Sequence, residues 1–414
     1  MPGTTRQRIV IGADTYPPDV NGAANFAHRL AAGLAGRDHE VHVICPSPGS
    51  GPDRVTVDGV TVHRLASHRT PFHPTFRVCL PWQTGRSAAR LLDRLAPDVI
   101  HVQSHFAVGR TLTMAARRRA IPVVATNHFM PENLIGYARI PGRLSAAACR
   151  LAWSDCVRVF RRAQIVTAPT PRAVRLLHEH GLGTTALPVS CGLDLRRFAQ
   201  PTADFGDEGH RVLFVGRLDA EKNVHELLRA LPLLPGELPV TAEVVGDGSC
   251  RRSLEALARE LGVHDRVTFH GLVSDQEVLN AYARCDVFCM PGTAELQSLV
   301  TMEAMAAGKP VVAADAMALP HLAHPGRNGF LYPPGDIRAL ASALTSILGD
   351  TEARTRMGEA SREIVAHHDI GHTLDTFETL YRDAAGTLRS KGVRRLPRAR
   401  ENSEKHEYAT YSGR

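Results

Sequence analysis

The chain has 414 residues and a mass of 45.0 kDa, enough for two or three domains of ordinary size. Hydrophobic residues make up 43% of the sequence and charged residues 22%, which excludes a disordered chain. No apolar run approaches the roughly 20 residues of a membrane-spanning helix, the N-terminus lacks a signal-peptide pattern, and the eight cysteines include no CxxC pair. These features predict a cytoplasmic protein with reduced thiols.

The net charge of +7 is distributed unevenly along the chain. Residues 1–190 contain 23 arginines, no lysine and 11 acidic residues, whereas residues 191–385 contain 18 basic and 28 acidic residues. The change of sign predicts two bodies with different partners. The basic half suits an anionic phospholipid surface or a phosphorylated acceptor, with arginine bias and surface solvation as the competing explanation. Nucleic acid is disfavoured, because only 5% of residues are aromatic and no nucleic-acid motif is recognised.

Short β-branched strands alternate with helical patterns along the chain. In the first half we expect strands at 8–13, 41–45, 99–102, 122–126 and 165–168, with helices at 23–34, 108–119 and 143–160. The pattern pauses at a Pro- and Gly-bearing hinge within 185–210. It resumes with strands at 212–215, 240–245, 267–269, 287–290 and 311–314, and helices at 224–230, 254–261, 278–283 and 299–307.

This alternation predicts an α/β protein with two doubly wound parallel-sheet domains, one over residues 1–190 and one over 191–385. Residues 386–414 are basic and lack apolar periodicity, so we expect a disordered tail. Ligands of open parallel sheets bind beyond the carboxyl ends of the strands, and facing loops of two sheets form a cleft. The loops that follow strands are therefore the candidate functional segments.

The strongest pattern in those loops is the segment from Glu295 to Glu303. Two glutamates lie eight positions apart, the first in a loop and the second in a helix, and both can face the cleft. Between them, near Leu299 and Val300, the helix N-terminus offers free N–H groups that attract a phosphate. Ionised carboxylates beside a phosphate site suit sugar hydroxyls. The competing interpretation is a solvated helix start stabilised by the macrodipole.

A second pattern follows the first strand of the second half. Gly216 allows the backbone to approach a ligand closely. Arg217 and Lys222, five positions apart, can neutralise a pyrophosphate and stabilise it as a leaving group. The same residues also fit a surface loop held by an ion-pair network.

Two weaker signals lie in the first half. His128 follows a strand and can donate to a sugar hydroxyl or hold a proton near neutral pH, although a lone histidine is more often structural. Asn21 and Gly22 precede the first helix and suit either a phosphate or a tight turn. Gly246-Asp247-Gly248 lacks the third glycine and the distant acidic residue of a dinucleotide fingerprint. No Asp-x-Asp metal motif, nucleophile elbow or P-loop is present in the sequence.

In combination, the motifs of residues 8–385 resemble the retaining GT-B glycosyltransferases of family 4. The matching motifs, in the family's order, are Asn21-Gly22, His128, Gly216-Arg217-Leu218, Glu221-Lys222-Asn223, Val245-Gly246-Asp247-Gly248, Phe269-His270-Gly271, Glu295 with Glu303, residues 303–312 and Asn328-Gly329-Phe330-Leu331. The resemblance implies a GT-B fold with two Rossmann-like domains, an interdomain cleft and a last helix, about 373–384, that crosses back to the first domain. Residues 297–300 and 126–133 are most similar to the diacylglycerol glycosyltransferases of the family.

The resemblance also implies a role for each matching position. The expected contacts are Arg217 and Lys222 with the donor diphosphate, Glu303 with the ribose, Glu295 with a hydroxyl of the transferred sugar, the backbone around Gly248, Gly271 and Leu272 with the nucleobase, and His128 with the donor sugar near the reacting centre. Gly22 is expected beside the phosphate when the cleft closes. Ser298 stands where the family commonly has glycine, and we expect it to cap the helix and preserve the phosphate site.

These roles predict a hexosyltransferase that needs neither a cofactor nor a metal and takes its sugar from a nucleotide diphosphate. UDP-glucose, UDP-N-acetylglucosamine and GDP-mannose are all candidate donors, and the acceptor hydroxyl belongs to a lipid, an envelope glycan or a specialised metabolite. The basic segment 137–163 predicts peripheral binding to the inner face of the plasma membrane, with a core-facing apolar stripe as the alternative. The competing functions are a GT-B-shaped epimerase or hydrolase and a non-catalytic nucleotide-sugar-binding protein; a nicotinamide dehydrogenase is more distant.

Overall fold

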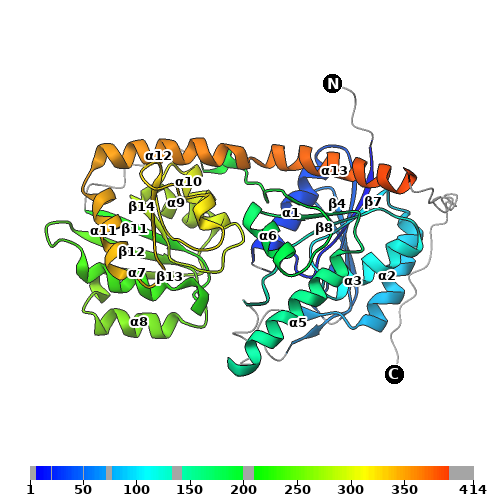
Figure 1. Ribbon diagram of the computed structural model, residues 1–414, viewed down its shortest axis with the longest axis horizontal. Helices are drawn as coiled ribbons and strands as arrows, with labels where there is room; N and C mark the ends of the chain where they lie inside the picture. Colours follow the sequence, from blue (N-terminus) through cyan, green and yellow to red (C-terminus); the bar gives the residue numbers. More distant parts are fainter. Residues whose placement is uncertain are drawn as a thin grey trace.

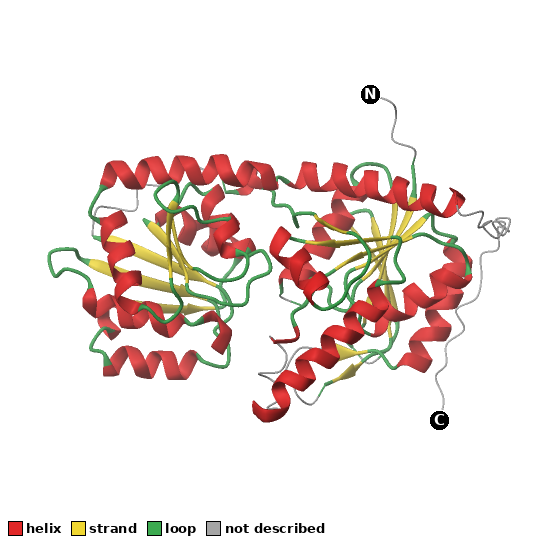
Figure 2. Ribbon diagram, in the orientation of Figure 1, coloured by secondary structure: helices red, strands yellow, loops and turns green. Residues whose placement is uncertain are grey.

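The computed structural model describes residues 6–19, 21–49, 51–70, 77–132, 142–198 and 209–390. These residues form two large sheets, each flanked by helices, with a long C-terminal helical segment running across both (Figures 1 and 2). Each sheet belongs to one half of the chain, so the sequence alternation does produce two α/β units of the doubly wound kind.

The first unit contains an eight-stranded sheet in the order β10-β9-β8-β7-β1-β2-β4-β3. Its strands are β1 (Arg8–Gly12), β2 (Glu40–Pro46), β3 (Asp53–Val57), β4 (Val60–Leu65), β7 (Val99–Val102), β8 (Val123–Thr126), β9 (Ile165–Ala168) and β10 (Ala186–Pro188), and a separate pair is formed by β5 (His68–Arg69) and β6 (Arg77–Val78). All pairings in the large sheet are parallel except that of β3 with β4. Its helices are α1 (Gly22–Ala35), α2 (Pro81–Leu95), α3 (Ala107–Arg118), α5 (Gly142–Phe160) and α6 (Pro171–Glu179).

The second unit contains a six-stranded parallel sheet in the order β13-β12-β11-β14-β15-β16. Its strands are β11 (His210–Val215), β12 (Val240–Val245), β13 (Val267–Gly271), β14 (Val287–Met290), β15 (Val311–Ala314) and β16 (Gly329–Tyr332). Its helices are α7 (Val224–Ala230), α8 (Arg251–Glu260), α9 (Asp275–Arg284), α10 (Leu299–Ala306) and α11 (Ile337–Leu348). Short 3₁₀ turns occupy Leu195–Arg197, Ala220–Lys222, Leu231–Leu233, His264–Arg266, Leu319–His321 and Ala366–His368.

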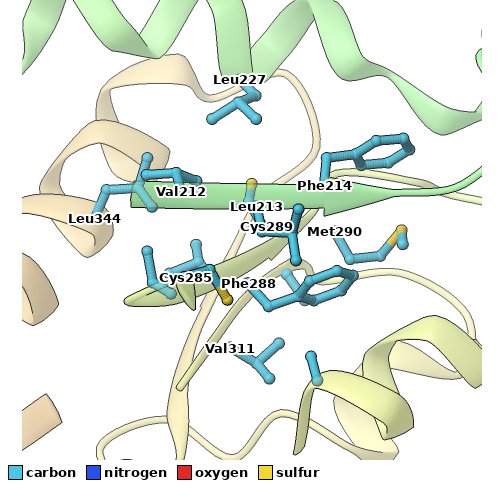
Figure 3. Packing of buried hydrophobic residues seen from close by; sticks show 14 of the residues in the cluster. Val212, Leu213, Phe214, Leu227, Cys285, Phe288, Cys289, Met290, Val311 and Leu344 are labelled. Atoms are coloured by element: carbon cyan, nitrogen blue, oxygen red, sulfur yellow. The ribbon is translucent and has the colours of Figure 1, made fainter. Parts of the chain in front are cut away.

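The core of the second unit lies on both faces of its central strands. Figure 3 shows Phe214 of β11 and Phe288 of β14 among aliphatic side chains from the flanking helices, and both rings are fully buried. Such continuous apolar strands are typical of parallel sheets covered on both faces. The buried core holds the loops at the carboxyl ends of these strands in place.

Helices α12 (Thr351–Val365) and α13 (Ile370–Ser390) carry the chain back from the second unit to the first. Figure 1 shows α12 above the second sheet and α13 above the first. Phe377 and Tyr381 of α13 are fully buried in the cluster that also contains Phe26 of α1. Side chains from the C-terminal part of the chain therefore complete the core of the N-terminal unit.

Each strand and helix expected from the alternation is present, with ends within about three residues of the expected ones. The pattern missed the β3–β4 hairpin, the β5–β6 pair, α2, α6, β10, β16, α11 and α12. Helix α13 continues to Ser390, past residue 385, where we expected the tail to begin. The remainder of that tail, 391–414, and part of the expected hinge, 199–208, lie outside the described residues.

The packing of α13 generates a stability prediction. Phe377→Ala should lower the free energy of unfolding by about 3–5 kcal/mol, because it empties a fully buried aromatic site in the first core. Thr376→Ala, at the adjacent exposed position of the same helix, should change it by less than about 0.5 kcal/mol. Denaturant unfolding of both variants tests this, and equal stabilities would show that α13 is not part of that core.

Candidate active site

The loops that follow β11 and β12 are packed backbone against backbone. The amide of Gly216 donates to the carbonyl of Val245 at 2.9 Å, and the amide of Leu218 donates to the carbonyl of Asp247 at 3.0 Å. A side chain at Gly246, whose φ is 130°, would overlap the carbonyl of Gly216. A glycine is therefore required at position 246 for the two loops to meet at the carboxyl edge of the sheet.

Arg217 and Lys222 both lie in the loop after β11, but they bind different carboxylates. Arg217 donates to Asp219 at 2.7 Å and to Glu221 at 3.1 Å, within its own loop. Lys222 instead forms a close ion pair with Glu295 from the loop after β14. The Lys222 and Glu295 side chains are 16% and 11% exposed, so this pair is largely shielded from water. The loop after β11 is therefore held by ion pairs, as the competing interpretation expected. One of these pairs joins two candidate donor-binding residues, Lys222 and Glu295.

Helix α10 begins after Ser298, as the sequence predicts, but Ser298 does not cap it through its side chain. Its φ is 64°, in the region that favours glycine, and its hydroxyl contacts the Thr301 hydroxyl at 2.8 Å rather than a backbone amide. The expectation of a serine N-cap was therefore wrong. The positive φ explains why glycine suits this position, and the first-turn amides at Leu299 and Val300 receive no bond from the Ser298 side chain.

Glu303 lies one turn inside α10, as expected from its spacing. The Tyr282 hydroxyl donates to its carboxylate at 2.9 Å and also lies 3.1 Å from the carbonyl of Val300. Burial raises the pKa of Glu303 above its usual range, and the Tyr282 hydrogen bond and the positive charges of Arg29 and Arg197 oppose that shift. Arg29 belongs to α1 of the first unit. A positive charge from the first unit therefore acts on the Glu303 carboxylate of the second unit.

The remaining expected donor positions lie along the edge formed by β12 and β13. Gly248 sits against the Leu218 backbone, and the carbonyl of Gly271 accepts a hydrogen bond from the amide of Gly246 at 2.9 Å. Leu272 follows Gly271 and is 79% exposed. The structure thus brings Gly216, Gly248 and Gly271 together through their backbones and leaves Leu272 on the surface beside them.

On the first unit, Asn21 and Gly22 form the start of α1. The Asn21 side chain accepts from the amide of Ala24 at 2.9 Å, so it acts as the N-cap of this helix. A Cβ at Gly22 would lie 3.7 Å from Leu299, the first residue of α10. Gly22 therefore lies directly across from the N-terminus of α10, on the opposite side of the junction between the two units.

His128 follows β8 at the same edge of the first sheet. Its Nε2 lies 2.7 Å from the Gln103 side-chain oxygen, its Nδ1 lies 3.8 Å from the Cys191 sulfur, and its ring packs 4.8 Å from that of Phe26. Burial lowers the pKa of His128 to about 4. The ring is therefore neutral at pH 7, which argues against the expectation that it holds a proton near neutral pH. The expected contact with a donor sugar stays a prediction.

Gln297, between the two glutamates, bridges the two units. Its amide nitrogen donates to the Ser190 hydroxyl at 2.7 Å, and its oxygen accepts from the amide of Cys191 at 2.9 Å. Thr170, at the N-terminus of α6, donates to the carbonyl of Leu296 at 2.9 Å. The loop that carries Glu295 is therefore fixed by two bonds to the segment that connects the units and by one bond to the first unit.

Comparison with known proteins identifies the family. The model of Glycosyltransferase Family 4 matches residues 20–197, and that of Glycosyl transferases group 1 matches residues 197–364. A GDP-mannose-dependent alpha-mannosyltransferase of Mycobacterium tuberculosis is 30% identical over 88% of this chain and 96% of its own length. The chain belongs to glycosyltransferase family 4.

Other relatives of this glycosyltransferase differ in their named activities. A glycogen synthase of Mycobacterium tuberculosis is 29% identical over 86% of this chain and 89% of its own length. The sucrose-phosphate synthase of Thermosynechococcus elongatus has a TM-score of 0.79, with 22% identity over 92% of this chain and all of that one. This structural likeness confirms the GT-B fold. The resemblance to the diacylglycerol glycosyltransferases stays a prediction.

Asp14 is a buried carboxylate, at the edge of the first sheet that faces the second unit, that the sequence did not suggest. Asp14 follows β1, and it accepts hydrogen bonds from the amides of Val108 and Gly109, at 2.9 and 3.2 Å, and from the Ser104 hydroxyl. These bonds direct the carboxylate to the N-terminus of α3. Asp14 is therefore engaged in holding that helix and is not presented as a nucleophile.

Two of the residues missed at this site had a recognisable signal. Gln103 follows β7 at the carboxyl edge where polar residues were sought, and Gln297 lies inside the strongest motif. Tyr282 and Arg29 had none, because each lies inside an ordinary helical pattern and reaches the site only through packing. Among the described residues, no helix is long and apolar enough to cross a membrane.

Proposed function

We propose that this enzyme transfers a hexosyl unit, with retention of configuration and without a metal ion, from a nucleotide diphosphate sugar to an acceptor hydroxyl. The observation that carries the proposal is the shielded Lys222–Glu295 pair, whose lysine shares the loop after β11 with Arg217. A diphosphate is the ligand that two neighbouring cations suit, and a carboxylate beside it suits a sugar hydroxyl. Helix α10 adds the partial positive charge of its N-terminus, opposite Gly22.

GDP-mannose is the first donor to consider. The relatives from Mycobacterium tuberculosis and from Mycolicibacterium smegmatis, 30% and 31% identical, are both named GDP-mannose-dependent alpha-mannosyltransferases. A UDP-linked hexose is the alternative, because the structurally similar HepE protein of Anabaena, with a TM-score of 0.73 and 21% identity over 91% of this chain and 99% of its own, is bound to UDP and glucose.

The proposed reaction takes place on one face of the sugar. The bond between the anomeric carbon and the diphosphate oxygen breaks, and Arg217 and Lys222 stabilise the negative charge that develops on the leaving group. The acceptor oxygen then bonds to the anomeric carbon from the same side, and its proton passes to a phosphate oxygen. No protein nucleophile is needed, which fits an Asp14 occupied by hydrogen bonds from α3.

The first unit is proposed to bind the acceptor and to contact an anionic membrane through α5. Leu144 and Leu151, two turns apart on this helix, are 59% and 72% exposed, while Trp153 on another face is buried. Arg150 and Arg158 are exposed on the same helix. An apolar and basic surface of this kind can bind anionic lipid. Figure 1 shows the start of α5 extending away from the body of the first unit.

A donor screen tests the proposed reaction. GDP-mannose should raise the melting temperature and be hydrolysed slowly without acceptor, and excess EDTA should change neither result, because protein cations hold the diphosphate. Differential scanning fluorimetry and nucleotide release measure this against UDP-glucose and UDP-N-acetylglucosamine. Fast donor turnover without acceptor would indicate a hydrolase or epimerase, and binding without any turnover would indicate a non-catalytic protein.

Arg217→Ala should reduce turnover by on the order of 10²–10³, because it removes a charge that stabilises the leaving group. Arg252→Ala removes an exposed arginine from α8 and is the matched control, with turnover expected to remain at the wild-type value. Initial rates at saturating donor measure both variants. Near wild-type transfer by Arg217→Ala would refute its role.

Vesicle co-sedimentation tests the membrane contact. Wild-type protein should bind vesicles rich in phosphatidylglycerol at low salt, less at high salt, and not bind phosphatidylcholine vesicles. Leu151→Ser should weaken the binding, whereas Leu233→Ser, at a position of the second unit that is 52% exposed, should not. No binding to anionic vesicles, or equal losses in the two variants, would contradict the proposal.

A further inference from the structure

A chain of hydrogen bonds runs through the first core from the C-terminal helix to His128. The hydroxyl of Tyr381, on α13, lies 2.8 Å from Nδ1 of His101 in β7. Nε2 of His101 lies 3.3 Å from the side-chain nitrogen of Gln103 and 2.6 Å from the Thr126 hydroxyl. Gln103 then contacts Nε2 of His128 at 2.7 Å through its oxygen. Tyr381, His101 and Gln103 are at most 3% exposed, so water does not replace these bonds.

With the Gln103 oxygen facing His128 and its nitrogen facing His101, the chemistry of the groups sets the direction of the chain. The Gln103 oxygen can only accept, so His128 carries its proton on Nε2. The Gln103 nitrogen can only donate, so Nε2 of His101 is the acceptor and His101 carries its proton on Nδ1. That proton is donated to the Tyr381 oxygen. Nδ1 of His128 is then unprotonated and faces the Cys191 sulfur at 3.8 Å.

We propose that Tyr381 is a positioning residue of the active site, which acts through His101 and Gln103 to hold His128 in its Nε2-protonated tautomer and in one orientation. The inference rests on the proposed function for the role of His128. It assigns to the C-terminal helix a part in the chemistry beyond its part in the core.

The same helix is also attached to the connection between the two units. The Thr373 hydroxyl donates to the carbonyl of Ser190 at 3.1 Å, and the amide of Ile370 donates to the carbonyl of Leu193 at 3.0 Å. The Ser190 hydroxyl in turn accepts a hydrogen bond at 2.7 Å from Gln297, in the loop between β14 and α10 that carries Glu295. A displacement of α13 therefore reaches both His128 and the loop that carries Glu295.

Removal of the Tyr381 hydroxyl should reverse the direction of proton donation along this chain of hydrogen bonds. In Tyr381→Phe the His101 Nδ1–H would be buried without an acceptor, which is costly, so the proton moves to Nε2 of His101. The Gln103 amide then turns to accept it and presents its nitrogen to His128, which must carry its proton on Nδ1 instead. Thr126 can follow, because its hydroxyl also contacts Thr167 at 2.6 Å and can act as donor or acceptor.

The test combines a spectroscopic and a kinetic measurement on the full-length protein. Long-range ¹H–¹⁵N spectra of [¹⁵N]histidine-labelled protein report the tautomer, with the His128 signals assigned by their loss in His128→Asn. Tyr381→Phe should convert His128 to the Nδ1-protonated form and lower kcat by about 10-fold, with little change in the donor KM. Tyr332→Phe is the control, because it removes a buried hydroxyl that bonds Glu226 at 2.7 Å in the second unit. It should change neither measurement.

A double variant separates positioning from a general loss of stability. If Tyr381 acts through Gln103, the kcat of Tyr381→Phe combined with Gln103→Leu should equal that of Gln103→Leu alone. Independent, multiplying losses would overturn the proposal, as would an unchanged His128 tautomer in Tyr381→Phe. The tautomer measurement requires neither donor nor acceptor. Its outcome is therefore distinguishable from a failure of the proposed reaction.

Discussion

The burial of α13 in the first core is the interaction on which the arrangement of the site depends. Phe377 and Tyr381 pack there beside Phe26, although more than 340 positions separate them from it. The chain passes from the first unit to the second and returns to the first through α12 and α13. The second unit is therefore attached to the first by two separate segments. Two attachments restrict the relative motion of the units far more than one linker would, so the carboxyl edges of the sheets stay opposed.

The loop between β14 and α10, which carries Glu295, is held in place by contacts from both units. Gln297 is bound to the connecting segment, Leu296 accepts from the first unit, and Glu295 holds Lys222. Breaking a shielded ion pair by removing one partner is costly, because the other charge stays unpaired. In the proposed reaction a donor would separate Lys222 from Glu295 without that cost, since its diphosphate would take the ammonium and its sugar hydroxyl would take the carboxylate.

The sequence was sufficient to predict the two sheets and the loops that carry the candidate donor-binding residues, whose roles stay predictions. Period and β-branched composition located the strands, and the rule that function follows strand ends located Lys222 and Glu295. The sequence was insufficient to predict contacts that arise from tertiary packing alone. Tyr282 reaches Glu303 from a neighbouring helix, and Tyr381 reaches His101 across 280 positions, so no spacing relates them. Ser298 was misjudged because its φ is set by the turn into α10, which composition does not reveal.

A neutral His128 is consistent with the direction in which charge develops during the proposed transfer. As the bond to the diphosphate breaks, positive charge accumulates on the sugar ring and negative charge on the leaving group. An imidazolium beside the sugar would repel the positive charge on the ring. In the proposed reaction, the cations of the second unit stabilise the negative charge on the leaving group. Burial lowers the pKa of His128 to about 4 and so keeps this charge absent at neutral pH. In the proposed reaction, His128 therefore adds no positive charge beside the sugar.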